Sequence, residues 1–280
     1  MSASQQQFVD RYIDVDGASL RVRIAGAGPA IVLVHGWALD LDMWQPQIDA
    51  LANWYRVLAF DRRGFGHSSG LPGIEHDVAD IDRLLDVFGI TQAAIIGMSQ
   101  GTRVALRWAM KHPQRALCLV LDGPPREGLP QVGDAAQEIP MEHYRDLVRR
   151  EGSDAFRSLW QQHPFMHLWT SDLSVHQRLR QIADRYPARD LEADEVPQRS
   201  PVGVHDLQEL TVPTLLINGA RDSDQRLLIA AQMAHVLPNA QSRIIADAGH
   251  LAALDNPDAY VQALIEFFQS QPALAAGARH

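Results

Sequence analysis

The sequence contains a single cysteine, Cys118, which lies inside an apolar run from Ala116 to Leu121. One cysteine cannot form an internal disulfide, so we expect a buried, reduced thiol. Basic residues are also scarce, because 25 lysines and arginines stand against 34 acidic residues and the net charge is −9. This balance argues against nucleic acid or an anionic membrane as a partner, since both require a basic face.

Long apolar stretches are absent as well. No run reaches the length that crosses a membrane, and residues 1–10 contain no basic segment followed by an apolar one. We therefore expect a cytoplasmic protein. The 280 residues, of which 46% are hydrophobic and 21% charged, are enough for one large domain with a substantial core.

Short apolar runs alternate with helical patterns over most of the chain. Strands are predicted at 8–15, 19–25, 31–34, 56–60, 93–96, 116–121, 213–217 and 242–245. Helices are predicted at 42–51, 74–88, 225–237 and 258–269, with another that follows residue 99 and ends before Pro113. This alternation predicts a mostly parallel eight-stranded sheet covered by helices on both faces.

The alternation stops at Gly123-Pro124-Pro125, and no apolar strand follows until about Val204. Aromatic and aliphatic residues in this interval occur in helical pieces. We therefore predict a helical cap over residues 124–204, inserted into a core formed by residues 1–123 and 205–280. The aromatic residues of the cap either line an apolar substrate pocket or only pack the cap onto the sheet.

The segment Gly97-Met98-Ser99-Gln100-Gly101 joins a predicted strand directly to a predicted helix. So sharp a turn forces its central residue into a strained, positive-φ conformation, which requires small neighbours two positions away on either side. The pattern is typical of a nucleophile elbow and identifies Ser99 as the candidate nucleophile.

A serine nucleophile needs a base and an acid that orients the base. Among the twelve histidines, His250 follows the last predicted strand and therefore lies at the same sheet edge as Ser99. Asp222, after the penultimate strand, is the favoured acid. Asp224 and Asp122 are rivals, the latter because its strand end borders the same crevice.

A developing oxyanion needs two hydrogen-bond donors. One is predicted to be the backbone N–H of Gln100, at the start of the helix, and the other the backbone N–H of Trp37. His35 is expected to shape the loop that carries Trp37. The spacing of His163 and His167 resembles a metal motif, but Pro164 separates them and no acid pair is near, so neither a metal nor a cofactor is expected.

The sequence resembles the α/β-hydrolase superfamily over about residues 8–270. The resemblance rests on the elbow, Gly249-His250, and three further segments: His35-Gly36-Trp37, the run from Asp61 to Ser68, and Gly219-Ala220-Arg221-Asp222. It implies that the run from Asp61 to Ser68 is a structural turn.

Subfamilies are separated by a few positions. Dehalogenase and epoxide-hydrolase relatives carry aspartate at the elbow, whereas this chain has Ser99. Haloperoxidase-like members commonly have proline where Ala38 stands, and carbon–carbon bond hydrolases usually have small residues where Trp37 stands. The chain is therefore most similar to small esterases and lactonases.

The sequence thus predicts a serine hydrolase of a small-molecule carboxylic ester or lactone, with Ser99, Asp222 and His250 as its triad. Two alternatives stay open: cleavage of a carbon–carbon bond in a diketone or dienoate, and a ligand receptor with little turnover. The sequence does not predict an oligomeric state.

Overall fold

The computed structural model describes residues 9–131, 139–193 and 200–275. Over these residues the strands form one eight-stranded sheet in the order β1-β2-β4-β3-β5-β6-β7-β8. The antiparallel part is at one edge, where β1 (Arg11–Val15) pairs with β2 (Ala18–Ala25) across the Asp16-Gly17 turn and β2 pairs with β4 (Arg56–Phe60). Phe8, predicted to begin this hairpin, lies outside the described residues.

The remaining strand pairs are parallel. They join β4 to β3 (Ala30–Val34), then β5 (Ala93–Met98), β6 (Ala116–Asp122), β7 (Thr214–Gly219) and β8 (Ala240–Ile245). The mostly parallel sheet predicted from the sequence is therefore confirmed. Because parallel strands share a direction, the loops after β3, β5, β6, β7 and β8 meet at one edge.

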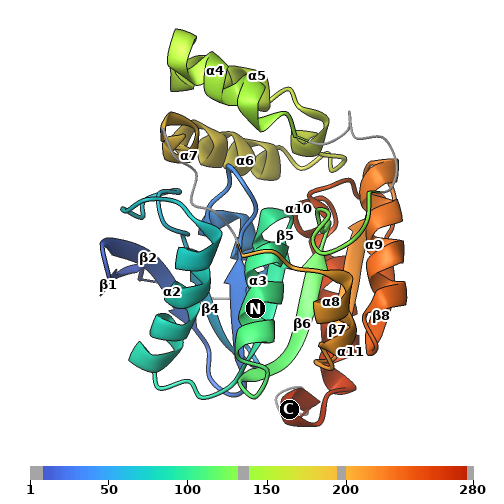
Figure 1. The fold of residues 1–280 in the computed structure, drawn as a ribbon. Helices are drawn as coiled ribbons and strands as arrows, with labels where there is room; N and C mark the ends of the chain where they lie inside the picture. The colour runs from blue at the N-terminus through green and yellow to red at the C-terminus, as the bar shows by residue number, and fades with distance from the viewer. Residues whose placement is uncertain (1–8, 132–138, 194–199, 276–280) are drawn as a thin grey trace.

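Helices cover both faces of this sheet (Figure 1). On one side lie α2 (Ile74–Val87), α3 (Gln100–Lys111), α8 (Val204–Glu209) and α9 (Asp224–Val236). On the other lie α1 (Gln45–Leu51), α10 (Ala252–Asp255) and α11 (Pro257–Gln269), followed by α12 (Pro272–Ala275). The region predicted as a helix over 42–51 consists of a 3-10 turn, η1 (Leu41–Trp44), and then α1, because the Asp40 side chain caps the turn.

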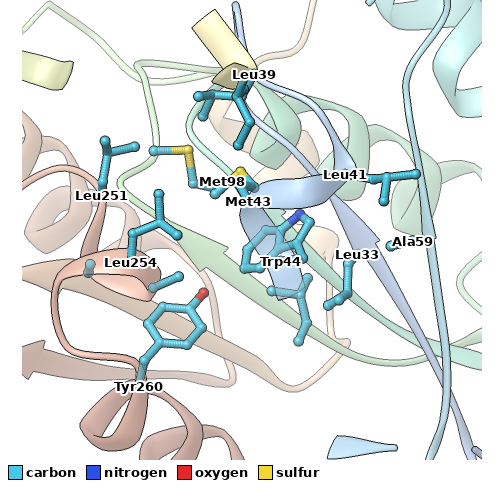
Figure 2. Packing of buried hydrophobic residues seen from close by; sticks show 14 of the residues in the cluster. Leu33, Leu39, Leu41, Met43, Trp44, Ala59, Met98, Leu251, Leu254 and Tyr260 are labelled. Atoms are coloured by element: carbon cyan, nitrogen blue, oxygen red, sulfur yellow. The ribbon is translucent and has the colours of Figure 1, made fainter. Parts of the chain in front are cut away.

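Alternate residues of the central strands supply two separate cores. Ile31 and Leu33 of β3 point into the cluster that contains α1 and α11, and Val32 and Val34 point into the one that contains α2 and α3. Figure 2 shows part of the first cluster around Trp44. Cys118 is fully buried in this cluster, as predicted.

Between β6 and α8 the chain forms the helices that lie across the carboxyl edge of the sheet, at the top of Figure 1. They are α4 (Met141–Glu151), α5 (Ser153–Trp160), the short turn η3 (Pro164–Met166), α6 (Leu173–Arg185) and α7 (Arg189–Glu192). We call this group the cap helices. Their buried side chains join the first core cluster without a break. In the described part of the chain, no helix has the length and apolar content needed to span a membrane.

Candidate active site

Ser99 stands at the junction of β5 and α3 in a conformation that residues with a side chain rarely adopt. Its φ is 49° and its ψ is −117°. Two hydrogen bonds hold the turn: the Ser99 N–H donates to the Asp122 carbonyl at 2.7 Å, and the Thr102 hydroxyl donates to the Ser99 carbonyl at 2.7 Å. Such strain at a pocket wall is characteristic of a functional position.

The two glycines of the elbow are required by close approach. A Cβ on Gly97 would lie 2.3 Å from the Gly101 carbonyl oxygen. A Cβ on Gly101 would lie 2.4 Å from the carbonyl oxygen of Val34, at the end of β3. Both distances are far inside van der Waals contact, so the steric reason inferred for the sequence motif also holds in the structure.

His250 and Asp222 are joined directly, although 28 residues separate them in the chain. The His250 Nδ1 lies 3.1 Å from each oxygen of the Asp222 carboxylate. Burial works to raise the pKa of Asp222. Three groups nevertheless hold this pKa below its usual range: the His250 ring, the Ser223 N–H and the Asn218 amide. An ionised Asp222 fixes the proton of a neutral imidazole on Nδ1 and leaves Nε2 free to act as a base.

Ser99 and His250 line one pocket, and both are nearly buried, with 7% and 5% of their surfaces exposed. Among the described residues, the Ser99 hydroxyl makes no hydrogen bond with the imidazole. Catalytic hydrogen bonds of this kind are often long before substrate binds.

The two rival acids are placed differently. Asp224 begins α9 and is exposed. Asp122 is completely buried, with the Tyr260 hydroxyl beside its carboxyl group. Burial, and then the negative charge of Asp222, raise the pKa of Asp122 well above its usual range, so this carboxyl is neutral. Of the three acids, Asp222 is the one that contacts His250.

The candidate oxyanion donors flank Ser99. Gln100 is the first residue of α3, where backbone N–H groups have no partner within the helix. Trp37 lines the pocket, and its N–H donates to no backbone carbonyl in the described residues. His35 connects the loop that carries Trp37 to the turn after β4. Its ring contacts the Gly36 carbonyl at 2.8 Å and accepts a hydrogen bond from the Arg62 N–H at 2.9 Å.

The pocket is almost entirely apolar. The empty space in it and in the open solvent at its mouth is together about 260 Å³. Its walls come from the loops after β3, β5 and β8 and from the cap, namely Trp37, Leu39, Met98, Ser99, Ile139, Trp160, Phe165, Met166, His250 and Leu251. The Phe165 ring lies on the His250 imidazole, with 4.3 Å between the centroids.

Comparison with known proteins identifies the family of the chain. The family model for the alpha/beta hydrolase fold matches residues 29–257. The chain belongs to the α/β-hydrolase family. It is 29% identical over 262 residues to a putative non-heme chloroperoxidase of Synechocystis sp., covering 87% of this chain and 92% of that protein.

Solved structures of two other α/β-hydrolases are similar over nearly their whole length. A thermophilic esterase from Thermogutta terrifontis has a TM-score of 0.75 and 27% identity, over 94% of this chain and 98% of that one. The enol-lactonase of Burkholderia xenovorans has a TM-score of 0.74 and 25% identity, over 92% of this chain and 100% of that one.

Three residues that the sequence patterns did not single out also touch the site of this α/β-hydrolase. Phe165 stacks on His250, as described above. Asp255 accepts hydrogen bonds from Gly249, at 2.8 Å, and from Trp169 of the cap segment, at 2.6 Å. Gly123 packs so closely that a Cβ there would lie 2.8 Å from the His250 Cε1. Of these three residues, only Gly123 had a signal in the sequence, namely the Gly123-Pro124-Pro125 break after β6.

His163 and His167, the pair with metal-like spacing, have separate surroundings. The His163 Nδ1 accepts a hydrogen bond from the Phe165 N–H at 3.1 Å, and its ring stacks on Trp160. His167 meets Trp169 edge-on. Burial lowers the pKa of His163, and so do the positive charge of Arg226 and that of His250 when its ring is protonated; His163 is therefore a neutral neighbour of the pocket.

Proposed function

We propose that the protein hydrolyses a small carboxylic ester or lactone through an acyl-enzyme intermediate on Ser99. The observation that carries this proposal is the conjunction of a positive-φ serine at the elbow and a buried His250–Asp222 pair on the wall of the same pocket. The similarity to an esterase and an enol-lactonase supports the same class of reaction.

In the first half-reaction, the Ser99 hydroxyl gives its proton to the His250 Nε2 and its oxygen attacks the substrate carbonyl carbon. The N–H groups of Trp37 and Gln100 stabilise the resulting oxyanion. The imidazolium then protonates the departing alcohol oxygen as the carbon–oxygen bond breaks. In the second half, His250 takes a proton from water as the hydroxide attacks the acyl carbon. The bond from this carbon to the Ser99 oxygen then breaks, the acid leaves, and the imidazolium returns its proton to the Ser99 oxygen.

Asp222 has a supporting role throughout. Its carboxylate holds the imidazole in the productive tautomer and stabilises the imidazolium formed in each half-reaction. Because the pKa of Asp222 is held below its usual range, this carboxylate stays charged at neutral pH. General-base and oxyanion contributions are each worth roughly 10²–10⁴-fold in rate in such sites.

The pocket walls favour a substrate with an uncharged acyl or alcohol part next to the reacting carbonyl. Leu39, Met98, Met166 and Leu251 contribute no hydrogen-bonding side chain beyond a weakly accepting sulfur. We therefore expect short aliphatic or single-ring esters to be turned over faster than esters with a charged group at this end.

The test is hydrolysis of p-nitrophenyl butyrate by the wild type and by Ser99→Ala. The variant is expected to lose at least about 10³-fold in kcat. Wild-type turnover by Ser99→Ala would overturn the proposal. A panel of short-chain, long-chain, aryl and lactone substrates, with a vinylogous diketone included, then separates ester and lactone hydrolysis from carbon–carbon bond cleavage.

A further inference from the structure

The side chain of Trp37 connects the loop after β3 to the cap helices. Its indole Nε1 donates a hydrogen bond to the Asp190 Oδ2 at 2.6 Å, across 153 residues of sequence. Asp190 lies on α7, and its second carboxylate oxygen accepts a hydrogen bond from the Tyr186 hydroxyl. Burial, and then the adjacent Asp190 carboxylate, raise the pKa of Tyr186 well above its usual range, so Tyr186 remains a neutral donor.

The indole ring is also enclosed by aromatic rings of the cap. The centroid of Trp160 lies 4.7 Å from it and that of Phe156 lies 5.5 Å away, while Tyr144 and Tyr186 complete the enclosure at about 6 Å. Only 4% of Trp37 is exposed. The aromatic rings therefore hold the position of this side chain, and the hydrogen bond to Asp190 sets the rotation of the indole.

The backbone on either side of Trp37 is strained or tightly packed. Ala38, directly after Trp37, has a φ of 55°, a left-handed conformation that costs a residue with a Cβ roughly 1–2 kcal/mol. Gly36, directly before Trp37, is confined, because a Cβ there would lie 2.7 Å from the Met98 Sδ. A strained segment of this kind persists only where its surroundings hold it.

We propose that Asp190 is a positioning residue for the oxyanion hole. By holding the Trp37 indole, it keeps the Trp37 N–H aimed at the site above Ser99 where negative charge develops. The proposal rests on the proposed function, since it requires the Trp37 N–H to be an oxyanion donor. Under this proposal the cap has two roles: it forms a wall of the pocket, and its correct docking is required for fast chemistry.

Attachment of the cap does not depend on Asp190 alone. Arg185, at the end of α6, forms ion pairs with Asp40 and Asp42 of the core, each at 2.7 Å. The Asp255 contacts with Trp169 and Gly249 tie a second cap segment to the core. Loss of the Asp190 carboxylate should therefore let the indole rotate within its aromatic enclosure while the cap stays in place.

The test compares Asp190→Ala with Asp190→Asn and with Glu192→Ala, an exposed acid of the same helix as a matched control. Asp190→Ala is expected to lower kcat for p-nitrophenyl butyrate by about 10–100-fold, part of the 10²–10³-fold that one oxyanion donor is worth, with KM within about twofold. Asp190→Asn should recover most of this loss, because its amide oxygen accepts from Trp37 and its NH₂ donates to the Tyr186 hydroxyl. Glu192→Ala should behave as the wild type.

Inhibition by an alkyl trifluoromethyl ketone distinguishes the proposed positioning role of Asp190 from a purely structural one. The Ser99 oxygen adds to the ketone carbon, His250 takes the serine proton, and the hemiketal oxyanion occupies the site between the two N–H donors. The inhibition constant is expected to rise for Asp190→Ala by the same factor by which kcat falls. Trp37→Phe, which removes the indole donor and keeps an aromatic ring next to the same backbone N–H, should show the same loss, and adding Asp190→Ala to it should cost nothing further.

Wild-type kcat in both Asp190→Ala and Trp37→Phe would overturn the inference, as would a loss confined to KM with unchanged binding of the ketone. If Asp190→Ala does not fold, Trp37→Phe and Asp190→Asn decide the outcome. These results are distinguishable from failure of the proposed function, because an active Ser99→Ala enzyme refutes that function whatever the Asp190 variants do.

Discussion

Replacement of Asp222 by asparagine tests which carboxylate orients the imidazole. Both oxygens of Asp222 accept hydrogen bonds: Oδ1 from the Ser223 N–H at 2.8 Å and Oδ2 from the Asn218 amide at 3.2 Å. The Ser223 N–H should hold the amide oxygen of an asparagine at the Oδ1 position. The NH₂ group would then occupy the Oδ2 position, 3.1 Å from the His250 Nδ1.

An NH₂ group there donates to Nδ1, and the amide oxygen at the Oδ1 position, although also 3.1 Å from Nδ1, is a weaker acceptor than a carboxylate; the balance therefore shifts to the tautomer with its proton on Nε2. The ring then faces Ser99 as a donor and cannot accept its proton. We expect Asp222→Asn to lower kcat by on the order of 10⁴-fold, about 5 kcal/mol in the activation free energy, with little change in KM. The assay is steady-state hydrolysis of p-nitrophenyl butyrate at pH 7.5.

Asp122→Asn is the matched control, since this acid ends the neighbouring strand. Its carboxyl is already neutral, so the amide should leave kcat within about threefold of the wild type. A large loss in Asp122→Asn together with an active Asp222→Asn enzyme would refute the reasoning and move the triad acid from β7 to β6.

The same control predicts a pH dependence of stability. A folded-state pKa raised above the unfolded value contributes stability that is present at low pH and lost as the pH rises towards the folded pKa. Relative to Asp122→Asn, the wild type should therefore lose up to about 1.4 kcal/mol of unfolding free energy per pH unit between pH 5 and 7. Urea unfolding at both pH values measures this difference. An equal gap at the two pH values would show that Asp122 is ionised in the fold.

Two further substitutions probe the support of the site. Gly123→Ala should lower kcat at least about 10-fold, because its Cβ would lie 2.8 Å from the His250 Cε1. Gly89→Ala is the control, because Gly89 also has a positive φ but nothing lies within 4 Å of the added carbon, and it should keep the wild-type kcat. Equal activity in the two variants would show that the Cβ at position 123 does not displace His250. Asp77→Ala should lower the free energy of unfolding by about 3–5 kcal/mol. It removes the carboxylate that lies 2.7 Å from the buried Arg62 guanidinium and so leaves that charge without a partner. A loss below about 1 kcal/mol in urea unfolding would contradict this.

The core of the fold was predictable because its signals are local. Each buried strand is a short apolar run, and the elbow needs small residues at fixed spacing around Ser99. The hairpin at Asp16-Gly17 and the stripe of apolar residues on α2 are signals of the same kind. The loops after β7 and β8 carry Asp222 and His250 to the edge that holds Ser99, so strand order alone brings them near one another.

Contacts made by the cap were not predictable in the same way. Asp190 is one acid among many in a polar helical segment, and nothing in its neighbourhood indicates Trp37 as its partner. Likewise, the choice between Asp222 and Asp122 depends on which side of the sheet edge each strand end faces. Both answers require the packed structure, because each depends on how one segment docks on another far away in sequence.

The position of the cap over Ser99 gives these contacts a functional meaning. Phe165 stacks on the base, Asp255 ties the His250 loop to Trp169, and Asp190 holds Trp37. Two of the groups assigned to the chemistry, His250 and Trp37, thus have cap residues against them or against their loops. We expect cap substitutions to change kcat as well as substrate preference.

The central claim is that His250 activates Ser99 as a nucleophile. Its most direct test is the rate at which a fluorophosphonate labels the protein, followed by mass spectrometry of the modified peptide, in the wild type and in His250→Ala. The account predicts a single adduct on Ser99, formed at least about 100-fold more slowly without the imidazole. Equal rates in the two proteins, or an adduct on another residue, would contradict it.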